Sequence, residues 1–177
     1  DSLANHVYMS DMKFVLDRTP IHSDMLMWHP DDPVENAALQ MVSVLYGVPQ
    51  ISVKLETLPE AHRKMLAFYL SFWREHRDTL IDGKLYAENP ESAYSIVYAE
   101  KSGKAIFTCY TDTRIDCSSH SETIAVNASR HSTLLLKGAD GKRYQVLDCM
   151  GNTIEAGTVK AALCEIEVPL SGMVFVQ

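Results

Sequence analysis

The sequence predicts a mixed fold, with an α/β part over residues 1–83 followed by an all-β part over residues 84–177. In the first part, apolar residues recur every three or four positions, and these stretches alternate with short strand-like runs. After Gly83 the period changes to two, and turn residues separate short β-rich runs. We therefore expect two domains that meet near residues 82–90.

The first part begins with a helix and a strand. One apolar face of the helix is formed by Leu3, Val7, Met12, Val15 and Leu16. Thr19-Pro20 ends this helix, because proline cannot continue it. Residues 21–27 then read as a short strand.

The second helix carries clear boundary signals. Asp32 is placed to cap its first turn, and Gly47 follows its last apolar residue. Its wide apolar face fits packing on a sheet. Residues 48–55 form the next predicted strand.

The third helix is the strongest helical pattern in the chain. Thr57 and Glu60 have the spacing of a capping box, and apolar residues then recur at three and four positions up to Leu80. Gly83 is the expected residue after its C-terminus.

The second part contains no helical period. Its predicted strands cover residues 93–99, 105–110, 123–127, 133–137, 144–147 and 173–176. Short, evenly spaced strands without helices predict an antiparallel β-sandwich. Two parallel strands cannot form a stable sheet alone, and the chain opens inside a helical pattern at Ser2-Leu3. The first part therefore reads as a piece of a larger α/β structure.

Composition excludes several classes of function. The net charge of −7 and the scattered basic residues disfavour nucleic acid as a partner. No apolar stretch approaches the roughly 20 residues that a membrane-spanning helix needs. The four cysteines have no close-spaced pair, so zinc is not expected, and free thiols in a reducing cytoplasm are favoured over a disulfide. The triplet Asn127-Ala128-Ser129 matches a glycosylation acceptor, a pattern common by chance.

The segment from His22 to His29 places Asp24, Trp28 and two histidines where a predicted strand ends before a predicted helix. A carboxylate there can accept hydrogen bonds from sugar hydroxyls, and an aromatic ring can cover the apolar face of a sugar. The alternative is that Asp24 is only a turn former or a helix cap. His22 and His29 flank Asp24, but the spacing supplies no third ligand for a metal.

Three motifs carry a family resemblance. Residues 23–28, 33–40 and 47–52 resemble the end of the catalytic barrel in family 36 α-galactosidases, the melibiases. The first of them is also similar to the Asp-Pro-Asp-Met-Leu segment of family 27 enzymes, although His22-Ser23 stands where that family has Asp-Pro. The resemblance continues through residues 72–77 and 80–83.

The resemblance implies the C-terminal part of a (β/α)8 TIM barrel, residues 1–83, followed by an antiparallel β-sandwich, residues 84–177. It implies that Asp24 and Met25 line a galactose pocket, and His22 and Trp28 are further candidates for substrate contacts.

The implied parent enzyme hydrolyses terminal α-D-galactosides with retention and without a cofactor. Its two catalytic carboxylates would lie upstream, so no catalytic residue is expected here. The expected partners are the α-galactoside, the missing N-terminal barrel portion and a further copy in a homo-oligomer. The alternative function is a non-catalytic β-sandwich module that binds a carbohydrate or a partner by itself.

Overall fold

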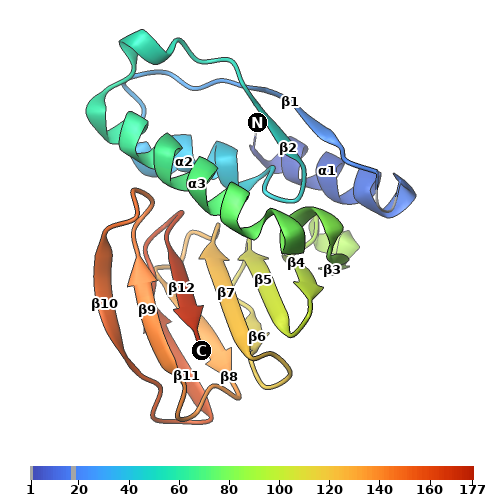
Figure 1. Ribbon diagram of the computed structural model, residues 1–177, viewed down its shortest axis with the longest axis vertical. Coiled ribbons are helices and arrows are strands. Elements are labelled where there is room, and N and C mark those ends of the chain that lie inside the picture. Colours follow the sequence, from blue (N-terminus) through green and yellow to red (C-terminus); the bar gives the residue numbers. More distant parts are fainter. Residues whose placement is uncertain (1, 17–18) are drawn as a thin grey trace.

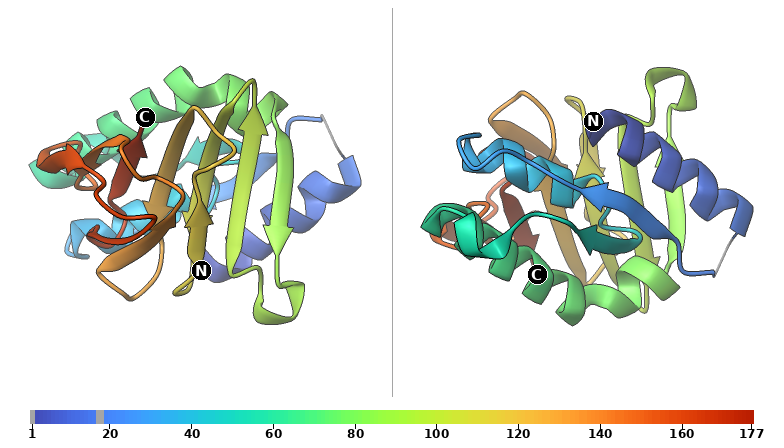
Figure 2. Two further views of the ribbon diagram at one scale, coloured as in Figure 1. Left: turned by 90° about the horizontal axis from the view of Figure 1, so that it is seen from below. Right: turned by 90° about the horizontal axis from the view of Figure 1, so that it is seen from above.

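The computed structural model describes residues 2–16 and 19–177, apart from the side chain of Asp24. The chain forms layers: three helices and a two-stranded sheet, then a seven-stranded sheet, then a three-stranded sheet (Figure 1). Seen from above, the helices and the short sheet lie over one face of the large sheet (Figure 2). The predicted mixture of helices and strands is therefore confirmed, and the described residues contain no complete barrel.

The helical layer follows the predicted order of elements. It consists of α1 (Ser2–Leu16), β1 (His22–Leu26), α2 (Val34–Val42), β2 (Val48–Ile51), the short 3₁₀ helix η1 (Leu55–Thr57) and α3 (Glu60–Asp82). Strands β1 and β2 are parallel and are connected through α2. Among the described strands, these two pair only with each other.

The remaining strands build two larger sheets. They are β3 (Lys84–Glu88), β4 (Ile96–Lys101), β5 (Lys104–Cys109), β6 (Arg114–Asp116), β7 (Glu122–Asn127), β8 (Thr133–Lys137), β9 (Arg143–Leu147), β10 (Thr153–Thr158), β11 (Leu163–Glu167) and β12 (Met173–Val176), with the 3₁₀ helix η2 (Pro90–Ser92) before β4. The large sheet has the order β10-β9-β12-β7-β5-β4-β3, and the small sheet has the order β11-β8-β6.

The expectation of purely antiparallel sheets is wrong for two pairs, β5–β7 and β6–β8, which are parallel. The reason lies in the path of the chain. After β5 it crosses to the small sheet as β6, returns to the large sheet as β7 and crosses again as β8. Strands that are neighbours within one sheet are then separated by a crossover, so they run in the same direction.

The large sheet is apolar on both faces. Phe107, Ala125 and Val174 point into a core shared with the small sheet. Ile106 and Ile124 point into a second core shared with the helices. Strands β5 and β7 are therefore buried almost continuously, as expected for a sheet covered on both sides.

Two buried tyrosines tie the helical layer to the sheets. The Tyr46 hydroxyl lies 2.9 Å from the carbonyl oxygen of Val97 and 3.0 Å from the side-chain oxygen of Thr108. The Tyr69 hydroxyl donates to the carbonyl oxygen of Ser171 at 2.5 Å. Burial raises the pKa of both phenols far above the usual value, so both remain protonated.

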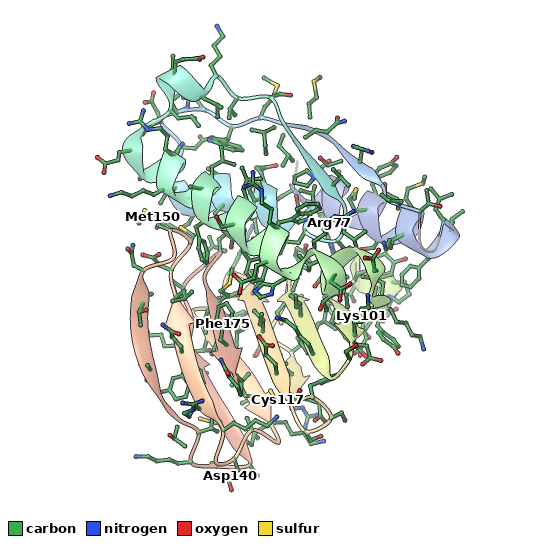
Figure 3. The ribbon with its side chains drawn as sticks, viewed as in Figure 1. Arg77, Lys101, Cys117, Asp140, Met150 and Phe175 are labelled. Atoms are coloured by element: carbon green, nitrogen blue, oxygen red, sulfur yellow. The ribbon has the colours of Figure 1, made fainter. Side chains whose placement is uncertain are left out.

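The hairpin between β9 and β10 reaches the helical layer as well. Met150, near its tip, packs against the helix-side core and lies close to α3 in the side-chain view (Figure 3). Gly151 follows it, and an added Cβ there would come within 2.6 Å of the Phe68 ring on α3. Phe175 of β12 meets Phe72 of α3 with ring centroids 6.3 Å apart. Residues 1–83 and residues 84–177 therefore share the helix-side core.

Helix α1 follows the predicted orientation only in part: Met12 of the predicted core face packs against the helix-side core, but other residues of that face are exposed. Two residues of the predicted core face, Leu3 and Val15, are 55% and 77% exposed. The buried residues are instead His6, Met9, Ser10 and Lys13.

The surface beneath α1 explains this orientation, because it presents backbone carbonyl groups that need donors. Lys13 donates to the carbonyl oxygen of Ile81 at 2.7 Å, and His6 Nε2 donates to that of Ala93 at 2.7 Å.

The predicted helix caps are also wrong. Helices α2 and α3 follow Pro33 and Pro59, and neither has a side-chain cap. The Thr57 hydroxyl donates to the carbonyl oxygen of Lys54, and the Asp32 carboxylate accepts from the amide of His29. Both polar side chains therefore stabilise the turn before the helix.

Gly83 ends α3 without a left-handed conformation, since its φ is −73°. Glycine is required there for space, because an added Cβ would collide with the carbonyl oxygen of Thr79 and lie 3.0 Å from that of Glu100.

A second buried histidine lies between α3 and the large sheet. His76 is 5% exposed, and its Nδ1 accepts from Lys104 Nζ at 2.8 Å. Lys104 also pairs with Glu122 at 3.1 Å. Burial, and then the charge of Lys104, lower the pKa of His76, and burial lowers the pKa of His6.

We expect Tyr46→Phe to lower the free energy of unfolding by about 1–3 kcal/mol, because buried acceptors lose their donor. Urea denaturation monitored by circular dichroism measures the loss. Tyr8→Phe is the control, since Tyr8 is 49% exposed. Equal stability of both variants would mean that the Tyr46 hydroxyl contributes nothing.

Stability should fall as the pH drops below the ordinary histidine value of 6.5, because the unfolded chain then binds protons that folded His6 and His76 resist. The stabilisation that the two neutral histidines contribute should be fully present above pH 6.5. Melting temperatures between about pH 7 and 5 test this. His76→Gln should flatten the dependence, and His131→Gln, at an exposed position, should not. An unchanged slope in His76→Gln would contradict the assignment.

Candidate functional site

The candidate site lies at the carboxyl ends of β1 and β2, which meet at one edge because the strands are parallel (Figure 1). Met25 and Met27 near the end of β1 are 62% and 66% exposed. Asp24 belongs to β1, but its side chain lies outside the part of the chain that the structure describes. Its role in sugar binding therefore stays a prediction.

A β-bulge sets the orientation of the side chains in β1. His22 pairs with Val48 and Met25 pairs with Gln50, so three steps along β1 match two steps along β2. Ser23 fills the irregularity: it is 4% exposed, and its hydroxyl accepts from the amide of Gln50 at 2.8 Å. The bulge leaves Met25 exposed, and Ser23 has a structural role.

Trp28 joins the end of β1 to α3. Its indole Nε1 donates to Nδ1 of His62 at 3.1 Å, and Nε2 of His62 donates to the carbonyl oxygen of Asp32 at 2.9 Å. Trp28 is partly buried and packs against the helix-side core, whereas His62 is 3% exposed.

His62 was not among the residues predicted from the sequence. Its spacing from Leu66 and Tyr69 on the buried face of α3 is the signal that marks it as an inward-facing polar residue.

His22 lies at the other end of the strand from Trp28. It is the first residue of β1, roughly 13 Å along the strand from Leu26 at about 3.3 Å per residue. Together with Ser23 it lines a cleft between β1 and α1, whose other walls are Ala4, Asn5 and Tyr8. The structure therefore does not bring His22 together with Trp28.

His29 stabilises a turn. Its Nδ1 accepts from the amide of Asp31, and its own amide donates to the carboxylate of Asp32. Over residues 2–16 and 19–177, no group of three histidine, cysteine or acidic residues is arranged to hold a metal ion.

Asn127 is structural. It is fully buried, and its amide nitrogen donates to the carbonyl oxygens of His131 and Val168 at 2.7 Å each. A buried amide that already donates two hydrogen bonds cannot accept a glycan, so the structure does not support glycosylation of Asn127.

Three of the four cysteines offer no reactive thiolate. All four are free, and Cys109, Cys117 and Cys149 are buried. Burial raises the pKa of the Cys149 thiol to about 12 and raises the other two as well. These thiols are therefore protonated and unreactive at neutral pH.

The described side chains at this edge offer contact area for a ligand. Met25, Met27 and Trp28 supply apolar and aromatic contact area. The Asp32 carboxylate is held in the adjacent turn by the amide of His29, and Asp31 is an exposed residue of the same turn.

Neither a scan against models of known protein families nor a search of curated proteins finds a match to this chain. None of the helices in the described part is both long and apolar enough to cross a membrane. The geometry of the site and the sequence motifs therefore carry the functional proposal.

We expect Ser23→Ala to lower the free energy of unfolding by about 1–3 kcal/mol, because the amide of Gln50 loses its acceptor inside the bulge. Guanidinium denaturation measures the change. Ser52→Ala is the matched control at an exposed position after β2. A Ser23 variant as stable as the control would show that the bulge does not need the hydroxyl.

Proposed function

We propose that this chain is the C-terminal part of a retaining α-galactosidase, formed by the last βα units of a TIM barrel and a β-sandwich behind them. In the parent enzyme it contributes Asp24 and Met25 to a pocket for a terminal α-galactoside, with Trp28 and His22 as further candidates that lie at opposite ends of β1. The catalytic carboxylates come from the missing N-terminal barrel portion, and no cofactor is needed. The buried free thiols favour a reducing compartment, the cytoplasm.

The β1–α2–β2 unit is the observation that carries the proposal. Two parallel strands joined by a helix form the repeating unit of a barrel, and the Asp24-Met25 motif lies near the carboxyl end of the first strand. A two-stranded sheet is marginal in water, and neither strand has a second partner among the described strands. Further strands of a barrel would complete the pairing.

The outward face of α1 supports the same proposal. Leu3, Tyr8, Phe14 and Val15 are each about half exposed or more. Helix α1 buries three polar residues beside Met9 and exposes these four apolar ones, and a cluster of exposed apolar side chains marks an interaction site. The missing barrel portion is the proposed occupant, and a second copy of the chain in a homo-oligomer is the other.

The alternative, a non-catalytic sugar-binding sandwich, gains little support from the aromatic residues. Tyr86, Tyr98 and Phe107 form a row across β3, β4 and β5, with ring centroids 4.8 Å and 4.6 Å apart. The stacked faces cover one another, and Lys84 lies over the Tyr86 ring at 4.7 Å. A sugar platform needs an open ring face, so this row argues against the module.

The isolated chain should not hydrolyse an aryl α-galactoside, because neither formation nor hydrolysis of a glycosyl-enzyme is possible without both carboxylates. Release of the aryl group by the purified chain measures this. Buffer without protein is the control. Turnover clearly above that control would contradict the proposal.

In the full-length parent, Asp24→Asn should lower kcat/KM roughly ten- to a hundred-fold, because the pocket loses charge-assisted hydrogen bonds to sugar hydroxyls. Asp31→Asn, at an exposed position in the adjacent turn, is the control. Steady-state kinetics and the melting temperature are measured on both variants. If Asp24→Asn lowers only the melting temperature, Asp24 is a structural residue and does not belong to the proposed pocket.

A further inference from the structure

The geometry points to His62 as the positioning residue that fixes the Trp28 indole at the edge of the galactoside pocket. This inference rests on the proposed function, in which Trp28 contacts the sugar. His62 itself is buried and would not touch the substrate. It would act through the ring that it holds.

Both nitrogens of His62 are engaged. Nδ1 accepts from Trp28 Nε1 at 3.1 Å, and Nε2 donates to the carbonyl oxygen of Asp32 at 2.9 Å. The neutral imidazole therefore carries its proton on Nε2, because Nδ1 must offer a lone pair to the indole. The two rings meet edge-on, with an interplanar angle of 66°. One side chain from α3 thus links the end of β1 to the turn before α2.

The indole N–H is the only polar group of the Trp28 side chain, so this hydrogen bond, together with packing against the helix-side core, orients the ring. The other tryptophan shows the contrast. Trp73 Nε1 donates to the backbone carbonyl oxygen of Gly47 at 2.9 Å, an acceptor that no substitution at position 47 removes. The acceptor of Trp28 is a side chain, so its orientation depends on the identity of residue 62.

Two conservative variants separate the two hydrogen bonds of His62. His62→Asn places an amide oxygen near the position of Nδ1, so it keeps the acceptor for Trp28 and loses the donor to Asp32. His62→Gln places an amide nitrogen near the position of Nε2, so it keeps the donor and loses the acceptor. A purely structural role for His62 would make the two variants similar in their effect on Trp28.

The experiment uses the whole 177-residue chain with Trp73→Phe, so that Trp28 supplies the only indole signal. The indole ¹H–¹⁵N resonance and its hydrogen exchange are recorded. We expect His62→Asn to keep both close to those of the background protein. His62→Gln should shift the resonance and speed its exchange at least tenfold, because the hydrogen bond that protects the N–H is lost. An unaffected indole in His62→Gln overturns the inference.

The imidazole tautomer in the unsubstituted chain gives a second test that does not depend on either variant folding. Long-range ¹H–¹⁵N spectra of His62 should show the proton on Nε2. A proton on Nδ1 would overturn the inference, because Nδ1 could not then accept from Trp28.

Titration of the full-length parent, in which the proposed pocket is complete, with methyl α-D-galactoside and, for comparison, methyl α-D-glucoside separates this inference from the proposed function. We expect the galactoside to perturb the Trp28 resonance more than its epimer does, and His62→Gln to weaken the response. If the indole depends on His62 but neither sugar perturbs it, the link between the two residues stands and the galactoside pocket is wrong. If the sugar response is the same in both His62 variants, the positioning role is wrong and the pocket stands.

Discussion

The large sheet must be covered on both faces, and most of the structure follows from this constraint. Strands β5 and β7 carry apolar residues on both sides, so neither face can be left in water. The small sheet covers one face, and the helices cover the other. The hydroxyl groups of Tyr46 and Tyr69 satisfy polar atoms at the helix–sheet contact, which lets the helical layer bury them without loss of hydrogen bonds.

The sequence predicted the elements whose pattern reflects their own burial. Helix α3 and strands β7, β8 and β12 were predicted close to their observed positions because their apolar residues face a continuous core. Strand β10 was missed because all six of its residues are exposed, so it has no alternation to detect. The face of α1 was predicted only in part because its partner is a set of backbone carbonyl groups, which leave no trace in the sequence pattern.

The candidate site was predictable in part for the same reason. The motif around Asp24 and Trp28 could be placed at a strand end from its flanking pattern. The bulge between His22 and Met25 could not be predicted from the sequence, because it depends on the register between β1 and β2. The role of His62 depends on the meeting of α3 with a turn 30 residues away, and only the three-dimensional structure joins them.

The position of β12 has a consequence for how the chain acquires its structure. This strand comes last in the sequence, yet it lies between β7 and β9 near the middle of the large sheet. During synthesis, β10 and β9 on one side and β7, β5, β4 and β3 on the other have no direct pairing until β12 arrives. Sheet closure is therefore a late, long-range event, and such topologies fold slowly and expose unpaired edges until they close. Until residues 173–176 take their place, the large sheet stays divided into two unpaired groups of strands.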